Sequence, residues 1–127
     1  MKKLIAVLLL FGTIAALFSA CTTGADASNK PNTVHMKELV FTPTSITIQK
    51  GEKVNIVNDV PIGHIIANGT WQNNTPKEGK EPGAPQINIQ FTGNDSQEIG
   101  PFNTAGTFQL YCTVHSGMNL TVVVKGS

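Results

Sequence analysis

Apolar residues alternate with other residues along most of the chain after residue 32, in short runs separated by turn residues. The two clearest runs lie near the C-terminus, over 106–112 and 119–124. In each run the residues of one face are apolar: Phe108, Leu110 and Cys112 in the first, Leu120, Val122 and Val124 in the second. A period of two, rich in aromatic and β-branched residues, predicts β-strands. We therefore expect two strands joined by a short loop over 113–118.

Further strands are predicted upstream, each bounded by Gly, Pro or Asn. They span 34–41, 45–49, 53–58, 86–91 and 96–99, and another begins at 65–66. After residue 32 no segment has a convincing helical period, and no internal repeat is present. Seven or eight short strands with regular turn signals predict an all-β fold, a sandwich or a barrel.

The N-terminal end has a different character. Lys2 and Lys3 precede an uncharged, mostly apolar run over 4–18, which is shorter than the roughly 20 residues of a membrane-spanning helix. A charged start, a short apolar run and then small residues indicate an export signal. The run ends in Phe18-Ser-Ala-Cys21, which resembles the lipobox of bacterial lipoproteins, with Phe18 in place of the usual Leu.

In lipoproteins the Cys of the lipobox is diacylated and becomes the mature N-terminus. The resemblance therefore implies a signal peptide over 1–20, a lipid anchor at Cys21, and a protein exported to the periplasmic or cell-surface side of the membrane. The alternative is an ordinary secretory signal with an incidental Cys. Residues 21–32 are small and polar and predict a flexible tether with a reach on the order of 20 Å. One domain, 33–127, remains.

The charge balance excludes one class of partner. The chain has nine basic and eight acidic side chains, and loss of Lys2 and Lys3 would leave a net charge of −1. No Arg occurs in the chain, so bidentate phosphate recognition is not expected. Such a composition gives no electrostatic basis for binding nucleic acid.

The loop between the two C-terminal strands holds three candidate metal ligands, namely Cys112, His115 and Met118. A thiolate, an imidazole and a weak thioether suit copper, which must be bound in both oxidation states. A trigonal site with two His, one Cys and a long axial Met lacks one ligand here, and His64 is well placed at another strand end. If Cys21 is acylated, Cys112 has no disulfide partner, and a metal would account for this leftover thiol.

Two motifs now carry a resemblance to a known family. Cys112-Thr-Val-His115-Ser-Gly-Met118 has two residues between each pair of ligands, and Asn58 precedes His64 by six positions. The segment 33–125 resembles the cupredoxins, the family of plastocyanin, amicyanin and azurin, and the short loop is similar to that of amicyanin. The resemblance implies an eight-stranded Greek-key sandwich with one type 1 copper ion, bound equatorially by His64, Cys112 and His115 and axially by Met118.

The resemblance also implies roles for residues around the ligands. Asn58 is expected to hydrogen-bond the residue after the Cys, Thr113, and the Ile65 N–H is expected to donate to the Cys112 sulfur. Gly63 leaves room for its carbonyl as a second weak axial contact. Electrons are expected to pass through the edge of His115, inside an apolar collar of Pro61, Ile62, Gly63, Gly117 and Met118.

Residues 68–85 interrupt the regular strand pattern, since these eighteen residues contain Trp71 and three prolines. Unstructured loops of that length are uncommon in compact domains, so part of the segment is expected to form a turn of helix or to pack on the sandwich. Trp71 is interpreted as an anchor at the edge of the core. The alternative is a role at the mouth of the copper site.

Three functions fit these observations. The first is a monomeric electron carrier with transient redox partners, which is not an enzyme because its copper has no open coordination position. The second is a copper-binding protein for storage, delivery or sensing with the same ligands. The third is a metal-free module of the same fold, against which the complete ligand set argues.

Overall fold

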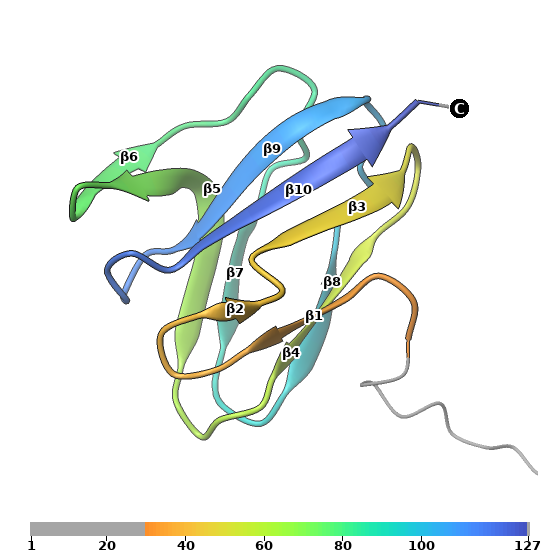
Figure 1. Cartoon of the computed structure of the whole chain (residues 1–127). Coiled ribbons are helices and arrows are strands. Elements are labelled where there is room, and N and C mark those ends of the chain that lie inside the picture. The colour runs from red at the N-terminus through yellow and green to blue at the C-terminus, as the bar shows by residue number, and fades with distance from the viewer. Residues whose placement is uncertain (1–29, 127) are drawn as a thin grey trace, which may run out of the picture.

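The computed structural model describes residues 30–126 (Figure 1). The predicted signal peptide, the predicted lipidation site Cys21 and most of the predicted tether lie outside these residues. The last tether residue, Asn32, is hydrogen-bonded to the domain: its side-chain amide donates to Glu52 Oε2 at 3.1 Å, and its carbonyl accepts from Asn55 N–H at 2.9 Å.

All regular structure in the described residues is β-strand, which confirms the predicted all-β sandwich. The ten strands are β1 (Thr33–Met36), β2 (Phe41–Thr42), β3 (Ser45–Gln49), β4 (Val54–Asn58), β5 (His64–Gln72), β6 (Thr75–Glu78), β7 (Asn88–Phe91), β8 (Ser96–Ile99), β9 (Gly106–Cys112) and β10 (Asn119–Lys125). Within residues 30–126 there is accordingly no helix that could cross a membrane.

The predicted count of seven or eight strands is too low for two local reasons. The run 34–41 is divided by a turn, in which Lys37 N–H donates to Val40 O at 3.0 Å, so β1 and β2 are separate strands. Segment 68–85 contains no helical turn. Instead β5 continues to Gln72 and pairs with β6 across Asn73 and Asn74, whose φ angles are 49° and 59°. Two central residues with positive φ make a tight hairpin of the type that Asn tolerates.

The strands form two facing sheets. One has the order β2-β1-β4-β8, and the other has the order β3-β10-β9-β5-β6 with β7 paired to β5. Figure 1 shows β3, β10 and β9 side by side in the second sheet. Two of the pairings, β1 with β4 and β3 with β10, are parallel, and the others are antiparallel.

The core lies between the sheets, where the alternating apolar positions of both sheets meet. Its largest fully buried apolar side chains are Phe41, Phe91, Phe102, Met36, Ile48, Ile56, Ile66, Leu110, Met118 and Leu120. Complete burial of such a side chain contributes about 1.5–3 kcal/mol. Strand β4 is buried at all five positions, which makes it a rigid support behind the other sheet.

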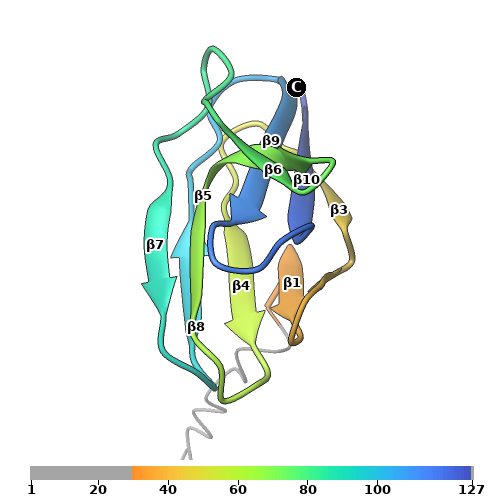
Figure 2. The ribbon, with the colours of Figure 1, turned by 90° about the vertical axis from the view of Figure 1, so that its left-hand side faces the viewer.

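Three strand ends meet at one end of the sandwich. Strand β4 ends at Asn58, and β5 begins at His64 after a five-residue loop. Strand β9, which is antiparallel to β5, ends here at Cys112. Strand β9 lies beside β5 in the register Ile66↔Cys112. Above the β9–β10 loop, the β5–β6 hairpin crosses the end of the sheet (Figure 2).

Candidate metal centre

Three of the predicted ligands converge at this end of the sandwich. Cys112 Sγ lies 3.6 Å from His64 Nδ1 and 3.4 Å from His115 Nδ1, and the two Nδ1 atoms lie 3.1 Å apart. The imidazole rings are tilted by 59° with centroids 4.7 Å apart. Cys112 and His64 are buried at 0% and 1% exposure, and His115 is half-buried. The cluster is therefore closed on the core side and reaches solvent through His115.

Strand register explains how His64 and Cys112 meet. Side chains on one face of a strand are two residues apart, so His64 and Ile66 point to the same side of β5, toward the core. Because Ile66 pairs with Cys112, His64 lies one step beyond Cys112 on that face. The end of β9 and the start of β5 thus bring together two residues that are 48 positions apart.

The loop 113–118 returns His115 to the same place. Cys112 N–H donates to Met118 O at 2.9 Å, and Met118 N–H donates back to His115 O at 3.3 Å. Gly117 has a φ of 80°, which a glycine adopts without steric cost. These bonds make the loop compact, so the chain from Cys112 to Met118 has little freedom.

The geometry fits a first-row metal ion with nitrogen and sulfur ligands. In a tetrahedral site with metal–nitrogen bonds of about 2.0 Å and metal–sulfur bonds of about 2.3 Å, ligand atoms lie about 3.3–3.6 Å from one another. The three observed separations, 3.1, 3.4 and 3.6 Å, are close to these values. Within the described residues this is the group of three His, Cys or acidic side chains with its donor atoms within 4.8 Å. One soft and two borderline donors match copper.

The electrostatics favour the metal-binding form of His64. Burial, followed by the proximity of His115, lowers the pKa of His64 below its ordinary value of 6.5, while Asp95 opposes the shift. The ring is therefore neutral at pH 7, as a ligand must be. Its other nitrogen, Nε2, is buried and has no hydrogen-bond partner among residues 30–126. The orientation of this ring thus depends on packing rather than on a bond to Nε2.

Met118 and the surface around His115 differ in part from the expected arrangement. Met118 has an exposure of 1% and packs in the hydrophobic core, so it does not belong to the exposed collar. Pro61, Ile62, Gly63 and Gly117 are exposed, and their grouping as a collar stays a prediction. Val114, at 54% exposure, is a further exposed apolar side chain of this loop, which the expected collar did not include. Its position directly before His115 in the sequence was the available signal.

Asn58 does not make the predicted bond to Thr113. Its side-chain amide donates to Ile62 O at 2.8 Å and to Asp95 Oδ1 at 3.4 Å, and its Oδ1 accepts from Val60 N–H at 3.4 Å. Asn58 therefore shapes the β4–β5 loop that precedes His64. Asp95 supports it from the neighbouring β7–β8 turn, where it also accepts from the N–H groups of Thr92 and Gly93 at 3.0 and 3.1 Å.

Other atoms hold the residue after the Cys. Thr113 N–H donates to Ile65 O at 2.8 Å, and Trp71 Nε1 donates to Cys112 O at 2.8 Å. The hydrogen-bond contacts of the Cys112 sulfur are the two imidazoles, and the expected donation from Ile65 N–H is not among the hydrogen bonds of residues 30–126. Trp71 thus contacts both the Cys112 carbonyl and the ring of the buried Tyr111.

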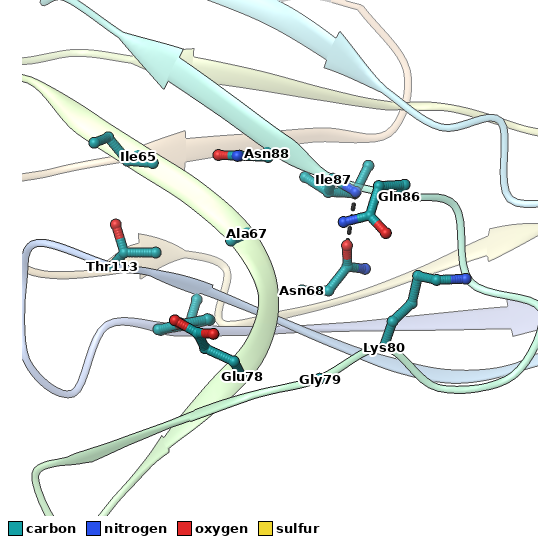
Figure 3. A pocket seen from close by; sticks show the side chains of 11 residues that line it. Ile65, Ala67, Asn68, Glu78, Gly79, Lys80, Gln86, Ile87, Asn88 and Thr113 are labelled. Carbon is teal, nitrogen blue, oxygen red and sulfur yellow. Dashed lines mark hydrogen bonds between the residues drawn. The ribbon is translucent and has the colours of Figure 1, made fainter.

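The outer face of the same strands carries a groove of about 620 Å³ (Figure 3). Part of its lining comes from residues of β5 and β9 and from the residue after Cys112, namely Ile65, Ala67, Tyr111 and Thr113. The rest comes from the end of β6, the segment after it and the start of β7. Burial, and then the charge of Glu78, raise the pKa of Tyr111 above its ordinary value of 10.0. Asn68 closes one side by accepting from Ile87 N–H at 2.7 Å.

Comparisons with known proteins agree with this geometry. The family described as copper binding proteins of the plastocyanin/azurin family matches residues 28–125. The chain is similar to plastocyanin from Scenedesmus fuscus, with 30% identity over 89 residues that cover 68% of this chain and 88% of the relative.

Two solved structures share the fold. Amicyanin from Paracoccus versutus has a TM-score of 0.59 and 24% identity, over 78% of this chain and 88% of amicyanin. A copper-containing nitrite reductase from Thermus scotoductus has a TM-score of 0.57 and 20% identity, over 76% of this chain but 22% of the reductase. The same sandwich therefore occurs both as a small protein and within a larger enzyme.

Proposed function

Because this chain belongs to the plastocyanin/azurin family of copper-binding proteins, we propose that it transfers single electrons through one copper ion. His64, Cys112, His115 and Met118 are its ligands in this proposal. The observation that carries it is the convergence of one thiolate and two imidazole nitrogens within 3.1–3.6 Å, at a half-buried site on rigid strands.

The ligand types decide the chemistry. Bound here, copper would supply one-electron redox chemistry by alternating between Cu(I) and Cu(II). The Cys112 thiolate would supply a soft donor that suits Cu(I), the two neutral imidazoles would bind both states, and the Met118 thioether would add a weak bond. Strands β5 and β9 and the bonded loop 113–118 hold these side chains in one arrangement, so little reorganisation accompanies the change of oxidation state.

In this proposal electrons leave through the exposed edge of His115. His115 is the ligand that reaches solvent, and apolar Ile62 and Val114 are exposed at 37% and 54% in the two loops beside it. A small apolar surface suits short-lived docking, and electron-transfer interfaces lie at the small end of the size range. The partners in this proposal are other redox proteins, met one at a time by a monomer.

One further contact belongs to this proposal. Gly63, which directly precedes His64, would direct its carbonyl oxygen toward the metal as a weak axial contact. A Cβ at Gly63 would lie 3.2 Å from Phe91 O, so the backbone runs close to β7 at this point. A crystal structure of the copper form tests the contact, and a copper–oxygen distance well beyond bonding range would exclude it.

The N-terminal sequence supports a location for this activity. Export through the signal 1–20 and acylation of Cys21 would tether the domain at the membrane, beside membrane redox partners. Mass spectrometry of the mature N-terminus tests this step. A diacylated Cys21, lost together with membrane association in Cys21→Ser, is the expected result. A mature chain that begins after an unmodified cleavage site would contradict it.

The deciding experiment is a visible absorption and EPR spectrum of the full chain with one equivalent of Cu(II), beside Cys112→Ala. An intense thiolate-to-copper charge-transfer band that the variant lacks is expected. A pale spectrum that does not depend on Cys112 would contradict the proposal. Reversible one-electron cycling without loss of copper to a chelator separates electron transfer from copper storage or delivery, in which the same ligands would release the ion readily.

A further inference from the structure

The carbonyl of Cys112 has lost its partner in the sheet. In an antiparallel ladder, a hydrogen-bonded pair of residues exchanges two N–H···O bonds. The register Asn119↔Tyr111 makes Cys112 and Met118 the next pair, and Cys112 N–H does donate to Met118 O at 2.9 Å. Met118 N–H, however, turns to His115 O at 3.3 Å to close the loop. Cys112 O therefore lacks its ladder donor.

Trp71 replaces that donor. Its indole Nε1 lies 2.8 Å from Cys112 O, although the two residues are 41 positions apart. At the other end of the same peptide unit, Thr113 N–H donates to Ile65 O at 2.8 Å. Both polar atoms of the Cys112–Thr113 peptide are thus held from outside the loop, one by β5 and the other by the β5–β6 hairpin.

The indole is itself fixed. Trp71 N–H donates to Asn119 Oδ1 at 2.7 Å, and Asn119 Nδ2 donates to Trp71 O at 3.1 Å. The ring stands edge-on to Tyr111 with centroids 5.9 Å apart. At the tip of the hairpin, Ser116 Oγ donates to Asn74 Oδ1 at 3.1 Å. The hairpin therefore hydrogen-bonds to the residues on either side of loop 113–118, Cys112 and Asn119, and to Ser116 within the loop.

We propose that Trp71 is a positioning residue for the copper thiolate, because its indole N–H and the Ile65 carbonyl together lock the peptide that joins Cys112 to the His115 loop. The inference rests on the proposed role of Cys112 and His115 as ligands. Rotation of this peptide moves the start of the loop relative to the Cys112 side chain, so it changes the distance between the sulfur and His115 Nδ1. Groups that orient ligands in this way typically affect metal affinity by about 10–100-fold.

The chain contains a single Trp, so replacing tryptophan throughout the protein changes this position alone. In the full chain, an analogue with sulfur in place of the indole N–H keeps the ring shape and removes the donor. A fluorinated tryptophan, which retains the N–H, is the matched control, and Trp71→Phe is a second donor-free form. The readouts are the Cu(II) charge-transfer band, the reduction potential and the rate of Cu(I) transfer to a chelator.

Both donor-free forms are expected to bind copper with a charge-transfer band that is shifted in energy, a changed reduction potential and Cu(I) loss faster by on the order of tenfold. The fluorinated control should match the natural protein. Unchanged band, potential and copper loss in the sulfur analogue would overturn the inference. Absence of the band in the natural protein would instead overturn the proposed copper site itself, so the two failures are distinguishable.

Discussion

The Nδ1 atoms of His64 and His115 lie 3.1 Å apart, and each is within 3.6 Å of Cys112 Sγ. Ligand atoms brought this close direct electron density at a shared point, which is favourable when a cation occupies that point. Because folding supplies this arrangement and the unfolded chain lacks it, metal binding and stability are coupled in this protein.

Copper is expected to stabilise the folded protein. When free Cu(I) is at 100 times its dissociation constant, the free energy of unfolding should rise by about 2.7 kcal/mol. Denaturant unfolding of the full chain with and without copper measures the increment. The Cys112→Ala variant is the control, since it lacks the thiolate and should gain much less. An equal gain in the variant would mean that copper binds elsewhere.

Met118→Leu separates the role of the thioether from its packing. Met118 is buried at 1% exposure, and a swap of similar volume should cost less than about 1.5 kcal/mol of stability. The reduction potential should rise, because loss of a donor destabilises Cu(II) more than Cu(I). Cyclic voltammetry measures the potential. A folded variant with an unchanged potential would show that the Met118 sulfur does not reach the copper.

Gly69→Ala is expected to weaken the β5–β6 hairpin. A Cβ at Gly69 would collide with the carbonyl of Lys77 and lie 2.8 Å from the Tyr111 ring, and its φ of 135° disfavours a side chain. Such overpacking costs about 1–3 kcal/mol, which thermal unfolding measures. Gly126→Ala is the control, because its nearest neighbour is Ala105 Cβ at an ordinary 3.8 Å. Equal melting temperatures in both variants would contradict the prediction.

Asp95 is expected to make stability depend on pH. Burial alone would raise its pKa, but hydrogen bonds from Thr92, Gly93 and Asn58 outweigh burial and hold the pKa below 3.8. A lowered carboxyl pKa contributes stability that is fully present above pH 3.8 and is lost as the pH falls through the folded value. The Asp95→Ala substitution should therefore lower the free energy of unfolding at pH 7 by about 1–2 kcal/mol.

The difference between the natural protein and Asp95→Ala should shrink as the pH falls below 3.8, because the natural protein loses the same bonds there. Unfolding free energies measured from pH 7 to pH 2.5 test this. The exposed Glu38 provides a matched acidic control, and Glu38→Ala should change stability by less than about 0.5 kcal/mol. A constant difference for Asp95→Ala over the whole range would show that its charge is not responsible.

Val114→Glu tests the surface beside His115. Val114 is 54% exposed, so the fold should be unaffected, and under the proposed function self-exchange would bring two copies together through this surface. Two added charges that meet at close range repel by about 1 kcal/mol, a slowing of about fivefold at low salt. NMR line broadening measures the exchange rate. Thr107→Glu, at the other end of β9, is the control, and equal slowing there would exclude a local effect.

Some features of this protein were local enough to be read from its sequence. The period-two runs specified strands and their faces, because alternation depends only on neighbouring residues. The spacing of Cys112, His115 and Met118 specified a compact loop with copper-type ligands. The pair Asn73-Asn74 also specified a tight turn, and the β5–β6 hairpin was missed because the prolines of 68–85 were interpreted as signs of irregular structure.

Other features depended on how distant strands meet. His64 joins the site because β5 lies beside β9 with Ile66 opposite Cys112, a register that no local pattern encodes. Asn58 bonds to Ile62 and Asp95 rather than to Thr113, since the β7–β8 turn packs against its loop. The sequence by itself determined the ligands of the loop and the all-β class. His64 was also expected from the sequence to join these ligands. Only the tertiary structure decided the partners of Asn58 and Trp71, because those contacts join segments more than thirty residues apart in the chain.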